Sequence, residues 1–493
     1  MICMRKWVKN TLAAVGVTGI FAVATGVGLG IAAAPAAEVG TGYYAEAACA
    51  TRYVLGKYNW DPDIPDNPLA GLITPARNIM ERSTSASILG LYTKRAYGVE
   101  NSGCVIADTP PKYSTSVPDI DTRAEQIRAT GGGVPQPTVE PSDPKRKKEL
   151  DKAVEDALDV KGARAVVIMK QGAVVGEGYG KDFDATTPQL GWSMSKSLTN
   201  LMAGRLAMEN KNFSVKDSQL RPEWNGEGDE RADITIDQLM RMTSGLEWNE
   251  NYDTGGDTPQ MLYREPNMPE YVADKPLEHT PGTYQEYSTG STNLLCNAMQ
   301  EKSGMGIDMA WRLIFKPLGM LSAEMAPDAS GNLVCGSYTW ATPRDWAKMG
   351  QFVANGGEIN GEKLLPDGWL KESTTATKVS ERDDPNSPAY GAGWWLNKSA
   401  NGSLFFKDLP ADMIWADGHD GQYTVIIPSK NVVVVRQGFS ENSTLESSGT
   451  LDVVRTALKS PEGEDESSSG AGAGAGAGTG VGYGAGAGAG YGY

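Results

Sequence analysis

Two segments of the chain are rich in β-branched and other apolar residues, and each predicts a pair of strands. Residues 164–180 divide at Gln171–Gly172, a pair typical of a tight hairpin turn. Residues 422–438 divide in the same way, around the turn residues 428–431. Because the two segments lie at opposite ends of one stretch of chain, we expect their strands to meet in a single sheet.

Between these segments the apolar residues follow a helical spacing. In residues 193–206 a stripe of large apolar side chains recurs at i, i+3, i+4 and i+8, which predicts a helix buried along one face. Its members are Leu198, Leu201, Met202 and Leu206. Residues 234–245 and 342–357 carry similar patterns. Strands at both ends of a domain with helices between them predict an α/β (α+β) fold, in which one antiparallel sheet is flanked by helices.

The N-terminus has a different pattern. Arg5, Lys6 and Lys9 precede a run from residue 10 to residue 37 that carries no charge and is long enough to span a bilayer. The small residues at 32–37 also suit a signal peptidase. A retained signal anchor and a cleaved signal peptide both remain open, and the alternative is a buried helix rich in glycine and alanine. Either signal predicts export, with the catalytic domain periplasmic, extracellular or held outside a membrane.

Changes in composition divide the chain into five parts. Residues 1–40 are the signal peptide or anchor, and 41–130 form a small N-terminal region whose role the sequence does not indicate. The proline-rich residues 131–146 are a linker. Residues 147–460 carry all the catalytic signals, and 461–493 combine an acidic, serine-rich spacer with a silk-like glycine and alanine tail that we expect to be disordered.

The charge and the histidine content exclude several functions. The net charge of −16 argues against binding to nucleic acid or to anionic lipid head groups. With only His279 and His419, and no H-E-x-x-H motif, the sequence predicts no metal and no cofactor. The expected partner is a small molecule, with membrane attachment only through an uncleaved N-terminal segment. The sequence does not predict the oligomeric state.

The cysteines suggest two disulfides. Cys3 precedes the uncharged run, which leaves four cysteines for the exported part of the chain. Sequence order favours Cys49 with Cys104 and Cys296 with Cys335, among three possible pairings. For the second pair, the alternative is that both are buried apolar residues without a covalent bond.

The segment at 191–200, GWSMSKSLTN, places three serines around one lysine. On a helix, residues three or four apart face each other, so Ser193 can reach Lys196, whereas Ser195 and Ser197 point elsewhere. A neutral lysine can take the proton of a serine and so turn it into a nucleophile. The start of the helix would also offer backbone N–H groups to a developing oxyanion. The alternative is that Ser193 only caps the helix.

Three motifs in order extend this interpretation: SMSK at 193–196, HTPGTYQEYSTGSTNLL at 279–295 and GHDGQY at 418–423. Together they resemble the serine hydrolases of the β-lactamase and penicillin-recognising superfamily, over about residues 150 to 457. The class C branch is the most similar. It includes class C β-lactamases, family VIII-type carboxylesterases, D-aminopeptidases and 6-aminohexanoate-dimer hydrolase.

This resemblance implies a role for each motif residue. Ser193 would attack the substrate and become acylated. Lys196 and Tyr287 would share the work of the base, with the pKa of the phenol lowered by the adjacent ammonium. The backbone N–H groups of Ser193 and Gln422 would form the oxyanion hole.

The remaining motif residues, Thr289, His419 and Gly421, would contact the substrate, and two of them depart from the β-lactamases. Thr289 stands where those enzymes carry an asparagine, and His419 stands where they carry a lysine that binds the substrate carboxylate. We therefore expect an acyl-enzyme hydrolase of small esters or amides, for which β-lactams are poor substrates. β-Lactamase or D-amino-acid peptidase activity is the first alternative. A non-catalytic receptor for peptides or lactams is the second, and a structural role through the tail is the third.

Overall fold

The computed structural model describes residues 27–58, 62, 64, 67–130 and 133–459, and only the backbone of residues 27–33. A seven-stranded antiparallel sheet lies at its centre. In spatial order its strands are β14 (Ala389–Tyr390), β15 (Trp395–Leu396), β16 (Ile414–Gly418), β17 (Gln422–Ile427), β18 (Val432–Gly438), β5 (Ala163–Lys170) and β6 (Ala173–Tyr179). The two predicted hairpins are confirmed, and β18 pairs with β5, so the ends of the domain close one sheet.

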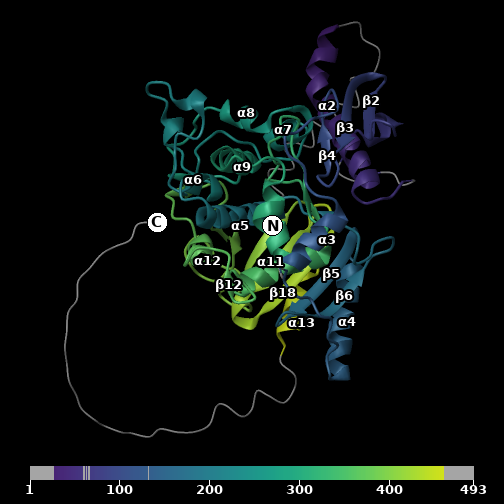
Figure 1. Cartoon of the computed structure of the whole chain (residues 1–493), viewed down its shortest axis with the longest axis vertical. Coiled ribbons are helices and arrows are strands. Elements are labelled where there is room, and N and C mark those ends of the chain that lie inside the picture. The colour runs from purple at the N-terminus through teal and green to yellow at the C-terminus, as the bar shows by residue number, and fades with distance from the viewer. Residues whose placement is uncertain (1–26, 59–61, 63, 65–66, 131–132, 460–493) are drawn as a thin grey trace, which may run out of the picture.

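Alternate residues of the central strands face two separate hydrophobic cores. Val167 and Val435 belong to the core that contains the buried residues of α5 (Met194–Glu209) and α11 (Pro343–Ala354). Val166 and Val434 belong to the other core, with the buried faces of α4 (Pro144–Leu158) and α13 (Thr450–Leu458). The two-residue period of a strand produces this division. The sheet is therefore covered by helices on both faces (Figure 1).

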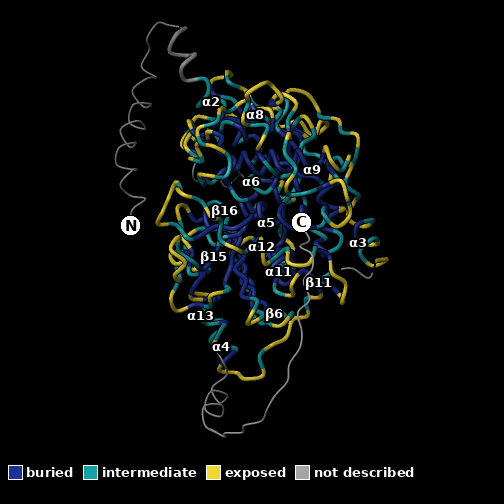
Figure 2. The backbone as a smooth tube through the Cα atoms, turned by 90° about the vertical axis from the view of Figure 1, so that its left-hand side faces the viewer, coloured by how far each residue is buried: buried dark blue, intermediate teal, exposed yellow. Residues whose placement is uncertain are grey.

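The predicted helices differ in how far they extend. The helix expected at 193–206 is α5, and the one expected at 342–357 is α11. The pattern at 234–245 forms only the short helix α6 (Ile236–Met240). Its chain turns at Met242, which has a φ of 61°, a left-handed conformation that a helix does not continue through. Figure 2 shows α5 buried in the middle of the molecule and exposed loops at the outside.

A group of helices lies on the side of α5 that faces away from the sheet (Figure 1). It comprises α6, α7 (Asp257–Arg264), α8 (Met268–Ala273) and α9 (Thr289–Ser303), and α9 packs against the other three and against α5. Short helical segments follow at η4 (Trp311–Phe315), α10 (Lys316–Leu318) and α12 (Trp369–Ser373). Four single helical turns are η1 (Ala70–Leu72), η2 (Pro222–Trp224), η3 (Glu230–Asp233) and η5 (Pro428–Lys430).

Small sheets occupy parts of the chain where mostly helices were expected. One has the order β7 (Gln189–Leu190), β10 (Thr339–Ala341), β9 (Glu324–Met325). The others pair β11 (Glu358–Ile359) with β12 (Glu362–Lys363), and β13 (Glu381–Arg382) with β8 (Tyr284–Gln285). Most of these strands are two residues long, too short to produce a periodic pattern in the sequence.

The N-terminal region contains regular structure. Helix α2 (Val27–Tyr53) packs on a four-stranded antiparallel sheet of β1 (Ile73–Asn78), β2 (Ser83–Ile88), β3 (Leu91–Gly98) and β4 (Cys104–Ile106). The predicted disulfide between Cys49 and Cys104 joins this helix to the sheet. Residue 40, the expected end of the signal segment, lies inside α2, and Ala37 and Val39 are buried. Helix α3 (Ile120–Ala129) follows the sheet.

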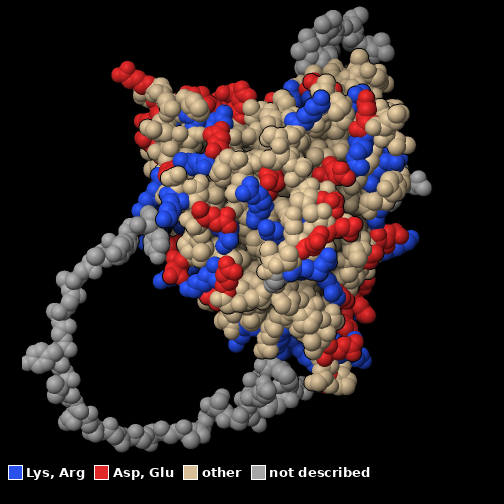
Figure 3. All heavy atoms as spheres, viewed as in Figure 1, with Lys and Arg blue, Asp and Glu red and all other residues tan. Residues whose placement is uncertain are grey.

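Two expectations fall largely on parts of the chain outside the description. Residues 10–26 of the uncharged run and the tail from residue 460 are not described, whereas residues 27–37 form the start of α2. Among the helices that the structure describes, none has the length and apolar character needed to cross a bilayer. The expected membrane segment falls mostly on residues outside the description and stays a prediction. Figure 3 shows acidic and basic side chains mixed over the face in view.

Candidate active site

Ser193 lies at the point where a tight turn leads into helix α5. Gly191 has no room for a side chain, because a Cβ there would lie 2.2 Å from the ring of Trp346. Trp192 follows with a φ of 46°, a left-handed conformation that costs free energy in a bulky residue and is common at active sites. Ser193 occupies the N-cap position, but its side chain makes no capping hydrogen bond. The simple capping role is therefore not supported, and the hydroxyl faces other partners.

The principal partner of Ser193 is Lys196, as the helical spacing predicted. The Nζ atom of Lys196 lies 2.8 Å from Ser193 Oγ. Lys196 is 2% exposed, and this burial lowers the pKa of its amine to about 8, although nearby Glu250 acts in the opposite direction. The other two serines lie elsewhere: Ser197 donates to the carbonyl of Gly393 at 2.6 Å, and Ser195 is fully buried.

Tyr287 completes the group around Ser193. It lines the same pocket as Ser193, and its ring centre lies 4.8 Å from Lys196 Nζ. Trp395 stacks on the ring at 5.5 Å. Burial, with a contribution from Tyr390, raises the pKa of Tyr287 well above its ordinary value. The expected lowering of this pKa was therefore wrong: the cost of desolvating a phenolate exceeds the effect of the lysine. Tyr287 is present as the neutral phenol, able to donate a hydrogen bond.

A pocket of about 220 Å³ opens in front of Ser193. Its lining is aromatic and acidic: Ser193, Glu250, Tyr252, Tyr287, Trp395, Asp417, Gly418 and His419. Among the described residues, no lysine or arginine lines this pocket. Burial raises the pKa of Asp417 to about 7. The pocket therefore offers no fixed positive charge to a substrate.

His419 forms part of one wall, at the turn between β16 and β17. Its ring stacks on Tyr252 at 3.9 Å and meets Trp192 edge to face at 5.4 Å. These contacts fix the plane of the imidazole beside the pocket. Asp420 follows with a φ of 58°, and its Oδ2 lies 3.4 Å from His419 Nε2.

The other two predicted contact residues, Gly421 and Thr289, do not line the pocket, and neither does Gln422, which was expected in the oxyanion hole. The carbonyl of Gly421 accepts a hydrogen bond from the buried Arg436 at 2.6 Å. Gln422 lines a separate cavity of about 40 Å³. Thr289 is fully buried, where it accepts from Lys196 Nζ at 2.8 Å and donates to Glu250 at 2.5 Å.

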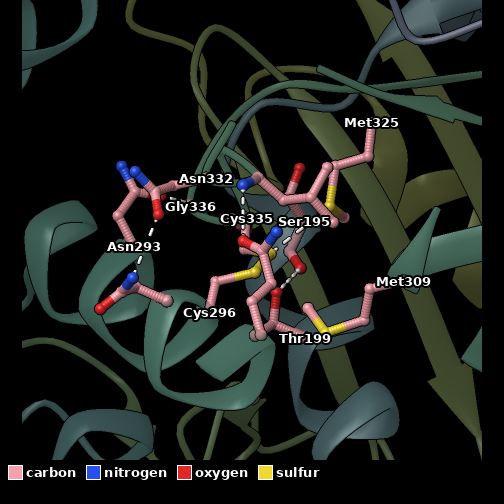
Figure 4. Close-up of a disulfide and its surroundings, with 12 residues drawn as sticks. Ser195, Thr199, Asn293, Cys296, Met309, Met325, Asn332, Cys335 and Gly336 are labelled. Atoms are coloured by element: carbon pink, nitrogen blue, oxygen red, sulfur yellow. Dashed lines mark hydrogen bonds between the residues drawn. A yellow bond between two sulfur atoms is a disulfide. The ribbon is translucent and has the colours of Figure 1, made fainter. Parts of the chain in front are cut away.

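The second disulfide supports the third partner of Lys196, the carbonyl of Gly336 at 3.0 Å. Cys296 in α9 is bonded to Cys335, which confirms the predicted pair and rules out two free thiols. The N–H of Gly336 donates to Asn293 in the same helix at 2.9 Å, and Thr199 in α5 donates to the carbonyl of Cys335 at 3.2 Å. Figure 4 shows this short segment held between the two helices. The disulfide thus fixes the segment whose carbonyl binds Lys196.

Sequence reasoning missed four side chains of the pocket: Glu250, Tyr252, Trp395 and Asp417. All lie in loops or at the ends of short strands, where no periodicity marks them. The acid and aromatic residues of WNENY at 248–252 are a composition signal, but nothing local connects them with Ser193. Among the described residues, no group of three histidine, cysteine or acidic side chains could hold a metal ion.

Comparison with known proteins agrees with this geometry. A family model described as Beta-lactamase matches residues 150–439. A protein described as a 6-aminohexanoate-dimer hydrolase from Bacillus anthracis is 18% identical, with a TM-score of 0.53 over 68% of this chain and 93% of its own. One described as a β-lactamase from Bacteroides dorei is 19% identical, with a TM-score of 0.50 over 62% and 95%. EstCE1, described as a hydrolase with promiscuous acyltransferase activity, is 15% identical, with a TM-score of 0.50 over 64% and 98%.

A search of curated proteins found no relative of this chain. The family match nevertheless spans more than half of the 493 residues and includes all three motifs. The solved structures share the fold with it. The chain therefore belongs to the β-lactamase family, within the superfamily of serine hydrolases that includes the penicillin-recognising proteins.

Proposed function

We propose that this protein hydrolyses small esters or amides through an acyl-enzyme on Ser193. The observation that carries the proposal is the contact of 2.8 Å between Ser193 Oγ and Lys196 Nζ at the edge of the pocket. An amine with a pKa of about 8 is neutral in an appreciable fraction of molecules at pH 7 to 8. It can therefore take the serine proton.

The proposed reaction has two halves. The hydroxyl proton of Ser193 moves to Lys196 while Oγ forms a bond to the substrate carbonyl carbon, and the carbonyl oxygen becomes an oxyanion. When the bond to the leaving group breaks, that group takes a proton from the Lys196 ammonium, with Tyr287 as the second donor nearby. A water molecule then attacks the carbonyl carbon of the acyl-enzyme ester and passes one proton to the same base. The base gives that proton to Ser193 Oγ as the bond between Oγ and the acyl carbon breaks, which releases the acid and free Ser193.

The oxyanion needs two donors, and we assign the first to the backbone N–H of Ser193. The third motif implies the backbone N–H of Gln422 as the second donor, but Gln422 is not among the residues that line the pocket. The end of strand β16 at Gly418, with His419 directly after it, lies at the pocket instead. We propose that this end of the strand supplies the second N–H.

The lining of the pocket supports a substrate without a negative charge. Glu250 and Asp417 are acidic, and the other large side chains are aromatic. A carboxylate such as that of a β-lactam would meet no fixed cation here, and would forgo a charge-assisted hydrogen bond of about 1.5–3 kcal/mol. A neutral acyl group fits, and so does a substrate with an ammonium group, which keeps the D-aminopeptidase alternative open. Against a receptor, ligand binding alone does not require a lysine with a lowered pKa.

A substrate screen tests this proposal. The purified protein should hydrolyse p-nitrophenyl acetate and p-nitrophenyl butyrate, with kcat/KM above that for nitrocefin. Alanyl p-nitroanilides of both configurations would test for an ammonium-bearing amide. Ser193→Ala is the control that measures background hydrolysis, which does not depend on this serine. A kcat/KM for nitrocefin equal to or above that for the esters would contradict the substrate class, and no Ser193-dependent turnover of any of these compounds would favour the receptor.

A further inference from the structure

Glu250 lies between the pocket and Lys196. Its carboxylate accepts four hydrogen bonds. Its Oε2 accepts from the backbone N–H of Thr289 at 2.8 Å and from the indole N–H of Trp248 at 2.6 Å. The hydroxyl of Thr258 donates to the same oxygen at 2.9 Å. Backbone and indole N–H groups can only donate, so the atom at the Oε2 position must be an acceptor.

The remaining oxygen of Glu250 determines the direction of the Thr289 hydroxyl. Thr289 Oγ1 lies 2.5 Å from Glu250 Oε1 and 2.8 Å from Lys196 Nζ, and the residue is 0% exposed. A carboxylate oxygen only accepts, so the Thr289 proton points to Glu250. The lone pairs of the threonine oxygen are then left for Lys196.

This direction fixes the orientation of a neutral lysine amine, which has two N–H groups and one lone pair. The Gly336 carbonyl, 3.0 Å from Nζ, can only accept, and Thr289 is restricted to accepting by Glu250. These two acceptors take both N–H groups. The lone pair is left for the third neighbour, Ser193 Oγ at 2.8 Å, whose proton it must receive.

We infer that Glu250 is a positioning residue: by making Thr289 an obligatory acceptor, it directs the lone pair of Lys196 toward Ser193. The inference rests on the proposed function, because it explains how the proposed base is aimed. It assigns work to Thr289, which does not line the pocket, and a second task to Glu250 besides its place in the pocket lining.

Glu250→Gln reverses this arrangement with little change in shape. The amide oxygen must take the Oε2 position, where two N–H groups donate, so the amide nitrogen faces Thr289 Oγ1. Thr289 then accepts a hydrogen bond from the glutamine amide and turns its own proton toward Lys196. That proton occupies the lone pair of the Lys196 amine, which is then no longer available to Ser193. We expect kcat/KM for p-nitrophenyl acetate to fall by about 10²-fold or more, which is the contribution of a positioned general base, with little change in KM.

The effect of charge alone has the opposite sign, which makes the experiment decisive. The carboxylate of Glu250 raises the pKa of Lys196, so its removal should leave more of the amine neutral at pH 7. If Glu250 acted only through its charge, Glu250→Gln would be as active as the wild type or more active at pH 7, and the acid limb of its pH profile would move to lower pH. That result would overturn the inference.

The effect should pass through the Thr289 hydroxyl. Thr289→Ser keeps the hydroxyl and should be faster than Thr289→Val, which lacks it. In the Thr289→Val background, Glu250→Gln should cause no further loss, since no hydroxyl remains to be turned. A further loss as large as in the wild-type background, or equal rates for Thr289→Val and Thr289→Ser, would contradict the inference. The two threonine variants carry the test if Glu250→Gln does not fold.

Parallel measurements of the wild type and Ser193→Ala distinguish a failure of the proposed function from a failure of the inference about Glu250. If the wild type shows no Ser193-dependent hydrolysis, the proposed function fails. If hydrolysis depends on Ser193 while Glu250→Gln keeps the wild-type rate, only the inference about Glu250 fails.

Discussion

Lys196 is a buried amine whose hydrogen-bond partners are all uncharged oxygens: Ser193, Thr289 and the Gly336 carbonyl. That environment explains why its pKa is lowered and why it suits the role of a base. The contact with Ser193 could be predicted because one turn of a helix fixes it. Glu250 could not be predicted, because a loop distant in sequence brings it to the site.

The pH dependence of acylation should report the protonation of the Lys196 amine. Protonated Lys196 cannot accept the serine proton, so kcat/KM for a neutral ester should be low in acid, rise through an apparent pKa of about 8, and level off above it. A stopped assay with p-nitrophenyl acetate between pH 5.5 and 10 measures this.

Lys196→Met is the control for this profile. It should lower kcat/KM by about 10²- to 10⁴-fold, the range for loss of a general base, and remove the limb near pH 8. If the limb persisted in this variant, another group would be responsible, and Asp417, with a pKa raised to about 7, would be the first to examine.

Elements that extend over several residues were predictable, and short ones were not. The hairpins of β5 with β6 and β17 with β18, and helices α5 and α11, each carry a periodic pattern long enough to recognise. Strands β14 and β15 have two residues each and depend on their neighbours in the sheet. The pocket lies at that end of the sheet, so most of its lining could not be predicted. Gly421 and Gln422 were expected at the site from the third motif alone, but the turn directs Gly421 to Arg436.

The disulfide between α9 and the segment that contains Gly336 should contribute both to the stability of the fold and to the rate of catalysis. Replacing Cys296 and Cys335 with serine should destabilise the fold by about 4 kcal/mol, the chain-entropy estimate for a loop of this length, and so lower the Tm. It should also lower kcat for p-nitrophenyl acetate at a temperature where the protein is folded, because the Gly336 carbonyl would hold Lys196 less firmly.

Replacing Cys49 and Cys104 with serine is the matched control. That pair closes a loop of similar length but joins α2 to β4, away from Lys196. It should lower the Tm while leaving kcat nearly unchanged. Equal losses of kcat in both variants, measured below both Tm values, would argue against a specific role for the Cys296–Cys335 bond.

On the scale of the whole molecule, the N-terminal region packs against the catalytic domain. Tyr43 in α2 meets Trp192 edge to face at 6.3 Å, and Trp192 in turn contacts His419. Glu38 forms an ion pair with Arg264 in α7 at 2.9 Å. The wall of the pocket is therefore supported by a region that showed no functional pattern in the sequence. The two disulfides are typical of a protein that folds in an oxidising compartment.

We predict that the catalytic domain is exported. The basic residues before the uncharged run, together with the disulfides, predict that the catalytic domain lies outside the cytoplasm. Protease added to intact cells, after any outer envelope has been opened, should digest the domain while a cytoplasmic marker stays intact. Complete protection of the domain under those conditions would contradict export.

Labelling with a fluorophosphonate probe tests whether Ser193 is the nucleophile. Mass spectrometry of the labelled wild type should find the probe on Ser193. Ser193→Ala should abolish labelling, and Ser195→Ala should keep most of it, because of these two serines it is Ser193 whose hydroxyl contacts Lys196. Labelling that survives in Ser193→Ala and disappears in Ser195→Ala would contradict the account.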